Sequence, residues 1–349
     1  MSLKTITSQM LPAIEGELQK QVARLDQTHT TVYYEMLTYH MGWTGEGAGP
    51  EATGKRIRPL MVLLCAAAST VDGFAMDSPL DQQHWKNALP AAAAVELVHN
   101  FSLVHDDIQD NSDKRRGRPT LWTKWGVPQS INAGDGLFVL SNLAVTDLAD
   151  AYRAETALRA ARVLHETCLD LTRGQFMDIS YEDRLDLSED DYWPMISGKT
   201  AALLAGCCQM GAILGGADLP TEKAYRDFGL ALGLAFQVQD DILGIWGDEA
   251  LTGKSAASDL LEGKKSLPVL YGLGKNGPFA QRWQAGPITP ADVKSVAQML
   301  ANEGASDYAQ NKSKEWTDKA LVNLEKAEPK GEAGSALREL ADRLLGRKA

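Results

Sequence analysis

The sequence predicts an all-α protein. Alanine and leucine are abundant while aromatic residues make up only 7% of the 349 residues, a balance that favours helix over sheet. Apolar residues recur with the period of a helix through most of the chain, and the alternating patterns of strands are scarce. Because no internal repeat or low-complexity linker interrupts these helical patterns, we expect one α-helical domain over residues 1–349.

The individual helices can be placed from this periodicity and from their end signals. Ile14, Leu18, Val22 and Leu25 mark the first helix. Ser188 with Asp191 three residues later predicts a capping box, and Thr289 followed by Pro290 predicts another helix start. The remaining helices are expected over 56–69, 86–110, 129–150, 155–180, 189–215 and 221–246, with a glycine-rich loop over 42–50, a polar loop over roughly 70–83 and shorter amphipathic helices in the last third.

Composition excludes several functional classes. A net charge of −11 argues against a nucleic-acid-binding surface, because the basic residues gather only in short runs near Lys55 and over 114–118. The four cysteines lie in apolar, helix-patterned stretches without a CxxC pair, so we expect reduced thiols and a cytoplasmic protein. The N-terminus lacks an apolar signal core, and glycines and Gln209 dilute the uncharged run 200–217. We therefore expect a buried helix there and no transmembrane segment.

Two aspartate clusters are the most informative feature of the chain. In the first, Asp106 and Asp110 share one helical face with His99 and Ser102, and Asp107 lies beside them. Carboxylates one turn apart on an apolar helix repel each other and lose hydration, so a bound cation is expected to stabilise them. Hard oxygen ligands of this kind suit Mg²⁺, which commonly also contacts phosphate. For this cluster alone, a solvated helix end with salt bridges is an alternative.

The second cluster repeats the pattern after a nearly apolar run, 228–236. Gln237 precedes Asp240 by three positions and Asp241 by four, so the three side chains can converge on one helical face. Two such clusters in one chain favour a metal-binding role over a merely solvating one. We therefore predict that the chain holds a phosphorylated substrate between two acidic helices.

Basic residues suited to phosphate binding accompany both clusters. Three cations open the helix after Gly54, where the helix N-terminus also favours anions. The GxxxxGK pattern at 49–55 is not a P-loop, because Arg56 stands where a Ser or Thr should bind magnesium. No zinc-like histidine spacing and no GxSxG motif is found. Further candidates are Arg115, Arg116, Asp178, Lys199 with Thr200, Lys254 and Lys264.

In these segments the chain resembles the trans-isoprenyl diphosphate synthases of the polyprenyl synthetase family, and most of all the geranylgeranyl diphosphate synthases. Eight segments in the family's order carry the resemblance over nearly the whole length. They are GKRIRP at 54–59, ELVHNFSLVHDDIQD at 96–110, RRGRPT at 115–120, GQFMD at 174–178, KT at 199–200, FQVQDD at 236–241, TGK at 252–254 and GKKS at 263–266.

The resemblance implies an all-α isoprenoid synthase-type bundle around a deep central apolar cavity, usually in a homodimer. It implies a catalytic set of Asp106, Asp110, Lys199, Thr200, Gln237 and Asp240. Magnesium, three ions per active site with Mn²⁺ as a substitute, is implied for Asp106, Asp107, Asp110, Asp178, Asp240 and Asp241. The allylic diphosphate is expected at Arg115, Lys199, Lys254 and Lys264, and isopentenyl diphosphate at Lys55, Arg58, His99 and Arg116.

The same resemblance implies the reaction. Such an enzyme condenses isopentenyl diphosphate with dimethylallyl, geranyl or farnesyl diphosphate. Phe101 and Ser102, five and four residues before the first aspartate, are implied to set product length and resemble the pair of geranylgeranyl-forming members, so a C20 product is expected. One departure stands out: Gly244 occupies the position where the family often has a third aspartate, and the nearby Asp248 is a candidate to compensate.

Three other interpretations stay open. The product is expected to be C15 or longer than C20 if the chain-length pair acts differently. A class I terpene cyclase shares the fold and an acidic metal site but has no need of an isopentenyl diphosphate site. A non-catalytic partner subunit of a heteromeric synthase is the alternative without enzymatic activity, although this chain keeps its acidic motifs.

Overall fold

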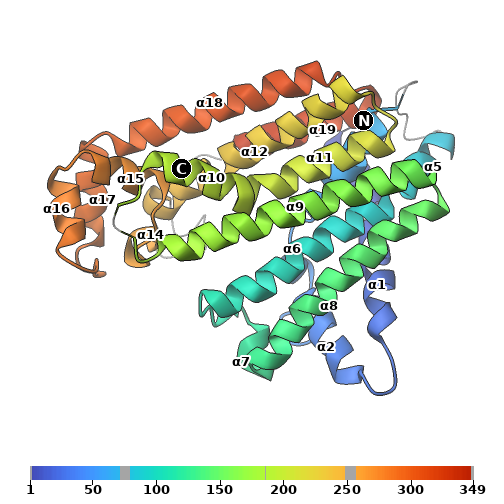
Figure 1. The fold of residues 1–349 in the computed structure, drawn as a ribbon, viewed down its shortest axis with the longest axis horizontal. Coiled ribbons are helices and arrows are strands. Elements are labelled where there is room, and N and C mark those ends of the chain that lie inside the picture. The colour runs from blue at the N-terminus through green and yellow to red at the C-terminus, as the bar shows by residue number, and fades with distance from the viewer. Residues whose placement is uncertain (1, 71–78, 185, 248–256, 347–349) are drawn as a thin grey trace. The chain divides into compact units, whose positions relative to one another are not determined.

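A computed structural model describes residues 2–70, 79–184, 186–247 and 257–346 of the chain. The regular structure of these residues is helical except for one antiparallel hairpin, which confirms the predicted all-α class (Figure 1). The hairpin joins β1 (Lys114–Arg115) to β2 (Arg118–Pro119), and Arg115 pairs with Arg118.

The chain divides into two compact units that interleave along the sequence. The first comprises Met1–Glu166, Gly206–Lys223 and Glu328–Leu337, and the second comprises the remaining segments. The single domain expected from the sequence stays a prediction.

The first unit is organised around α6 (Leu89–Gln109), which packs against α8 (Val127–Thr146), α4 (Ile57–Ala68) and α1 (Leu3–Val22). Four consecutive buried alanines, residues 91–94, make α6 narrow at this point, so that neighbouring helices can pack closely against it. Its other helices are α2 (Thr31–His40), α3 (Pro50–Thr53), α5 (Pro79–Asn87), α7 (Leu121–Trp125), the start of α9 (Ala154–Tyr181) and the short turns Ala23–Leu25 and Asp147–Asp150.

The second unit holds the rest of α9 and most of α12 (Leu219–Trp246). Its core gathers Tyr192, Ile196, Leu234, Val238 and Leu267, which are all fully or almost fully buried. The other elements are α10 (Glu189–Ile196), the π-helical turn η3 (Ser197–Ala201), α11 (Ala202–Leu214, shared with the first unit), α14 (Ser258–Leu261), α15 (Leu267–Gly274), α16 (Pro278–Gln284), α17 (Val293–Asn302), α18 (Ala305–Lys326) and α19 (Gly331–Leu345, also shared).

Most predicted helices are present, and the differences have local causes. The capping box at Ser188 is confirmed, because its side chain and that of Asp191 cap each other's backbone. The predicted helix start at Thr289 is wrong: α17 begins at Val293, and the Thr289 hydroxyl instead donates a hydrogen bond to Asp292 at 2.9 Å. The helix expected over 189–215 is interrupted by the π turn, and α5 occupies part of the loop expected over 70–83.

Two expectations about exposure can be compared with the structure. The four cysteines (Cys65, Cys168, Cys207 and Cys208) are buried and free, as predicted. Within the described ranges, α12 is the one helix long and apolar enough to cross a membrane, and 67% of its most apolar window is buried inside the protein. That burial is typical of a core helix. The uncharged run 200–217 begins in the last two residues of the π turn and continues through α11.

Candidate active site

The three aspartates at the end of α6 face different environments. Asp106 is half-buried and Asp110 is exposed, whereas the side chain between them, Asp107, is buried with 2% of its surface exposed. Asp106 and Asp110 are one helical turn apart and so present their carboxylates on one face. The first cluster therefore separates into an outward pair and an inward partner.

Asp107 is tied to the hairpin. The Nε of Arg115 donates a hydrogen bond to Asp107 Oδ1 at 2.8 Å. Burial raises the pKa of Asp107 to about 6, although the Arg115 guanidinium favours the ionised form. The resemblance implied metal binding for Asp107 and phosphate binding for Arg115; in the structure the two side chains bind each other.

The hairpin and the loop before α4 are in contact, although some 60 residues separate them in sequence. Arg116 donates a hydrogen bond to the Ala52 carbonyl at 2.7 Å. Gly54 has φ +79°, and a Cβ there would come within 2.7 Å of the Arg116 guanidinium. Glycine is therefore needed at this position both for its backbone conformation and for the close approach of Arg116.

Arg56 holds the same loop in place through ion pairs. Its guanidinium binds Glu15 at 2.6 Å and Glu96 at 2.8 Å, and only 2% of its side chain is exposed. Trp43 completes the cluster by donating its indole N–H to Glu15 at 2.8 Å. This ion cluster fixes Arg56, which lies between Lys55 and Arg58, the two residues of this segment predicted to bind isopentenyl diphosphate. Lys55 is exposed to solvent.

Arg58 and His99 form a second pair. Their side-chain nitrogens Nη1 and Nε2 lie 3.3 Å apart. Because arginine can only donate, His99 Nε2 must accept, so the imidazole is neutral. Burial and the neighbouring arginines lower the pKa of His99 well below its usual value. Among the residues that the structure describes, none forms a hydrogen bond with the buried Nε of Arg58, which leaves this charged donor unsatisfied.

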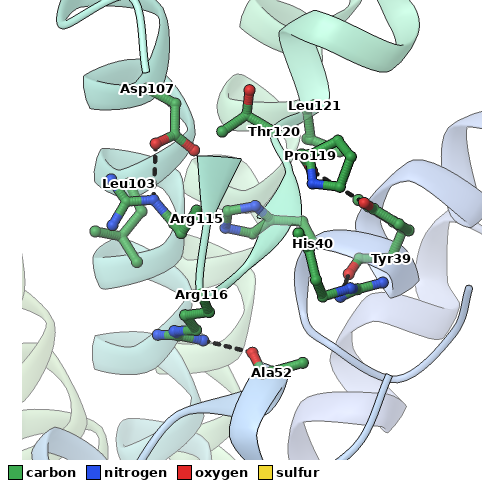
Figure 2. Close-up of a pocket in the computed structure, with 11 residues that line it drawn as sticks. Tyr39, His40, Ala52, Leu103, Asp107, Arg115, Arg116, Pro119, Thr120 and Leu121 are labelled. Carbon is green, nitrogen blue, oxygen red and sulfur yellow. Dashed lines mark hydrogen bonds and ion pairs between the residues drawn. The ribbon is translucent and has the colours of Figure 1, made fainter. Parts of the chain in front are cut away.

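A small cavity lies beneath the hairpin (Figure 2). It is lined by residues that include His40, Asp107, Arg115, Arg116 and Arg118, and its volume is about 20 Å³. That is room for one water molecule but far too little for a diphosphate. Burial and the neighbouring arginines lower the pKa of His40 to about 3, so it is neutral. His40 carries no sequence signal, because it ends α2 outside any motif.

The two predicted chain-length residues lie on different sides of α6. Phe101 packs its ring against Phe138 of α8, with centroids 5.0 Å apart, and against His105, edge to face at 5.6 Å. The Ser102 hydroxyl donates back to the His99 carbonyl at 2.8 Å. Phe101 is thus held by the neighbouring helix, and Phe138 is a contact that the sequence analysis did not identify.

The second cluster shows the same division as the first. On α12 Asp240 is exposed, whereas Asp241 is buried with 5% of its surface exposed. The carboxylate of Asp241 accepts hydrogen bonds from the Tyr192 hydroxyl at 2.7 Å, the Leu267 backbone N–H at 2.9 Å and the Gln237 amide at 2.9 Å. Burial raises its pKa to about 7. Of the two adjacent aspartates, only Asp240 faces solvent.

Thr200, Gln237 and Asp178 lie near Lys199, where the π turn is located. The Thr200 hydroxyl donates to Gln237 Oε1 at 2.7 Å, and Lys199 forms an ion pair with Asp178. The predicted cation and the predicted acid again bind each other. A π turn is frequent at functional sites, since it re-aims side chains within a helix. Here it presents two adjacent predicted site residues in succession.

The glycine that replaces the third aspartate has a structural explanation. The carboxylate of Asp259 on α14 occupies the space that a side chain at Gly244 would fill. Lys264, a predicted phosphate ligand, lies 3.9 Å from the same carboxylate. Asp259 is buried and was not singled out from the sequence. Lys254 and Asp248 lie outside the described residues.

Each unit thus brings together part of the predicted site. The first unit contains the outward carboxylates of α6 and a cluster of cations. The second unit contains Asp240 and the ion pair of Lys199 with Asp178. Within the described part of the chain, no three acidic, histidine or cysteine side chains converge as a metal cage. The structure brings together Arg58 with His99 and Asp107 with Arg115 in the first unit, and Lys199 with Asp178 and Thr200 with Gln237 and Asp241 in the second. The first unit also contains Lys55, Asp106, Asp110 and Arg116, and the second also contains Asp240 and Lys264.

An all-α fold with aspartates near two helix ends and several arginines and lysines in the same units is typical of helical enzymes that act on diphosphates. Comparison with known proteins names the group. The polyprenyl synthetase family model matches residues 49–300, and the chain belongs to this family.

Its relatives are similar over most of their length. The chain is 39% identical to the geranylgeranyl diphosphate synthase of Mycobacterium tuberculosis, over 83% of this chain and 80% of that protein. It is 34% identical to a (2E,6E)-farnesyl diphosphate synthase of Mycobacterium bovis, over 96% and 91%. The crystal structure of geranylgeranyl pyrophosphate synthetase from Pyrococcus horikoshii matches with a TM-score of 0.84 at 32% identity, covering 99% of this chain and 98% of that one.

Proposed function

We propose that the protein is a trans-prenyltransferase that condenses isopentenyl diphosphate with an allylic diphosphate to give an all-trans prenyl diphosphate, geranylgeranyl diphosphate (C20). The observation that carries this proposal is the presence of two kinds of anion site. One kind has outward carboxylates, at Asp106, Asp110 and Asp240, which would bind a diphosphate through metal ions. The other is the group of Arg58, His99 and Arg116, in which the Nε of Arg58 has no hydrogen-bond partner among the described residues, and we assign this group to a diphosphate bound without a metal.

The carboxylates fit magnesium better than any metal that needs a protein cage. Their donors are hard oxygens, and no set of three metal-binding side chains converges among the described residues. Mg²⁺ retains water and is commonly bound by one or two carboxylates together with substrate phosphates. Asp106, Asp110 and Asp240 are the residues we assign to it, with Mn²⁺ as a substitute. Asp107 and Asp241 are inward acceptors and support the neighbouring ligands.

The residues divide the reaction between them. The allylic C–O bond breaks and leaves an allylic cation, and Mg²⁺, when bound, stabilises the charge on the departing diphosphate. Arg115 and Lys199 exchange their present partners, Asp107 and Asp178, for phosphate oxygens. Arg58 and His99 hold isopentenyl diphosphate so that its double bond attacks the cation. A proton is then lost to the released diphosphate, and Gln237 and Thr200 present oxygen atoms near the cationic carbon.

One assay tests this function against its alternatives. The purified chain is incubated with isopentenyl diphosphate, Mg²⁺ and each of dimethylallyl, geranyl and farnesyl diphosphate. We expect consumption of isopentenyl diphosphate and release of inorganic diphosphate. A class I terpene cyclase would convert an allylic diphosphate without consuming isopentenyl diphosphate. A non-catalytic subunit would be inactive alone and raise the activity of an added partner synthase.

We place the enzyme in the cytoplasm.

Product length should depend on Phe101. Replacing Phe101 with alanine removes a ring that contacts Phe138 and should open space beside α6, so the product mixture should shift from C20 to longer chains. Chromatography of the dephosphorylated products measures the shift. Replacing Phe138 with alanine should act in the same direction, and Phe279→Leu in the second unit serves as a control that keeps C20. An unchanged product from both ring deletions would remove this pair from the chain-length role.

We also propose that the enzyme is a homodimer, in agreement with an exposed apolar surface on the first unit. Val139 and Leu143, one turn apart on α8, are 56% and 43% exposed, and Leu158 of α9 is 72% exposed. A second copy of the chain is the partner we assign to this face. Val139→Lys with Leu143→Lys should yield monomers by light scattering, while Val322→Lys on α18 should not. A wild-type chain that is already monomeric at micromolar concentration would contradict the proposal.

Gly244 and the carboxylate of Asp259 lie against each other in the second unit. We propose that the buried Asp259 carboxylate occupies the space of the third carboxylate that the second motif lacks and supports magnesium binding at Asp240 from inside the protein. Gly244→Asp alone should destabilise the protein by about 2 kcal/mol or more, because the new side chain overlaps a buried carboxylate. Asp259→Gly should raise the magnesium concentration needed for half-maximal activity. The double exchange, Gly244→Asp with Asp259→Gly, should recover both properties, and failure to recover either would contradict the exchange.

A further inference from the structure

The buried aspartate of the second motif, Asp241, ends a chain of hydrogen bonds with a defined direction. Its Oδ2 accepts from both the Tyr192 hydroxyl and the Leu267 backbone N–H, at 2.7 and 2.9 Å. Its Oδ1 accepts from the Nε2 of Gln237 at 2.9 Å. Tyr192 and Asp241 are 1% and 5% exposed, so water competes little for these bonds. Both carboxylate oxygens are therefore committed to donors inside the protein.

The direction of this chain determines which end of the Gln237 amide faces Thr200. In its ionised form Asp241 only accepts hydrogen bonds, so the amide end beside it is then the NH₂ group. The opposite end is then the oxygen, and this Oε1 accepts the Thr200 hydroxyl at 2.7 Å. An amide oxygen carries partial negative charge, and its orientation decides whether the group stabilises or repels a nearby cation.

We propose that Tyr192 and Asp241 are positioning residues that hold the Gln237 side-chain oxygen toward Thr200. The inference rests on the proposed function only in giving Gln237 and Thr200 a place near the cationic carbon. Tyr192 was not identified from the sequence. In this proposal Asp241 acts by holding the side-chain amide of Gln237 in one orientation, in contrast to the direct metal binding expected from the resemblance.

The nearly isosteric change Asp241→Asn provides a sharp test. The Oδ2 position receives two donors, so the asparagine must place its oxygen there and its NH₂ at the former Oδ1 position. That NH₂ faces Gln237, which must flip to accept it. The flipped glutamine then turns its own NH₂ toward Thr200. We expect kcat to fall about tenfold or more while the KM values for both diphosphates and the magnesium requirement stay near wild type.

A second change should reverse the effect. In Asp241→Asn with Gln237→Glu, one oxygen of the new carboxylate accepts from the asparagine NH₂ and the other accepts from the Thr200 hydroxyl. The double variant has the charge of the wild type and again presents an oxygen to Thr200. Gln237→Glu alone places two carboxylates in contact and should be poorly active. We expect the double variant to exceed both single variants in kcat.

Tyr192→Phe provides an independent variant with a smaller disturbance. It removes one of the two donors to Oδ2 but leaves the Leu267 N–H, so Gln237 keeps its orientation with greater mobility. We expect a fall in kcat of a few fold, with unchanged KM values. Tyr271→Phe, a tyrosine of the same unit outside this chain of hydrogen bonds, is the matched control and should leave kcat unchanged.

The orientation of Gln237 can also be measured without turnover. In protein labelled with ¹⁵N-glutamine, the Gln237 amide signal is assigned by its loss in Gln237→Glu. We expect slow solvent exchange of this NH₂ in the wild type and faster exchange in Asp241→Asn. Unchanged exchange in Asp241→Asn would overturn the inference even if the wild type proves inactive as a synthase. A raised magnesium requirement in Asp241→Asn without rescue by Gln237→Glu would overturn it in favour of direct metal binding.

Discussion

Replacing Asp240 with alanine is expected to lower kcat by about three orders of magnitude, equivalent to about 4 kcal/mol of lost transition-state stabilisation. Asp240 is the exposed member of the second aspartate pair, and its carboxylate is the one we assign to magnesium. Steady-state kinetics over a range of magnesium concentrations measure the effect. Excess magnesium or manganese should restore only part of the lost rate.

The contrast with the adjacent residue makes this result informative. Asp241→Asn is expected to retain far more activity and a normal magnesium requirement, because Asp241 is buried and accepts internal hydrogen bonds. Direct measurement of Mn²⁺ binding by electron paramagnetic resonance separates metal binding from catalysis. Equal loss of Mn²⁺ binding in both variants would contradict the division of the pair into an outward ligand and an inward support.

Replacing Arg56 with methionine is expected to lower the free energy of unfolding by about 3–5 kcal/mol, because it leaves a buried carboxylate without its partner. Glu96 is 3% exposed and would lose its ion pair with Arg56, which has a length of 2.8 Å. Denaturation by urea measures the change. The KM for isopentenyl diphosphate should also rise, since Arg56 fixes the loop between Lys55 and Arg58.

Two further variants separate charge burial from loss of packing. Arg56→Met combined with Glu96→Met should recover a substantial part of the stability, because a packed apolar pair avoids the buried charge. Arg162→Met removes one member of an exposed ion pair on α9 and should change stability by less than about 0.5 kcal/mol. A single-variant loss below about 1 kcal/mol for Arg56→Met would contradict the role given to the cluster.

The helices were predictable because their signals are local. Apolar periodicity and the Ser188 capping box depend on residues within one or two turns, and α4, α9 and α12 lie within a few residues of their expected bounds. The π turn at Ser197–Ala201 was not predictable, because it depends on a close approach of Gly198 to the backbone of Gly174 on α9, which is distant in the sequence. The two compact units were likewise invisible, since each is assembled from distant stretches of the chain.

The site shows the same limit at the level of single side chains. Motifs identified the aspartates and the cations, but adjacent aspartates share one sequence signal and differ only in what covers them. Burial of Asp107 and Asp241 depends on Arg115 and Tyr192, which come from other elements. The carboxylate beside Gly244 is also supplied from elsewhere, by Asp259, and His40 ends a helix without any motif.

The most direct test of the central claim is the product formed by the purified wild-type chain. With isopentenyl diphosphate, Mg²⁺ and farnesyl, geranyl or dimethylallyl diphosphate in turn, we predict that isopentenyl diphosphate is consumed and that C20 geranylgeranyl diphosphate is the main product. Chelation of the metal should abolish the reaction. Conversion of an allylic diphosphate without consumption of isopentenyl diphosphate, or no turnover with any of the three primers, would contradict the account.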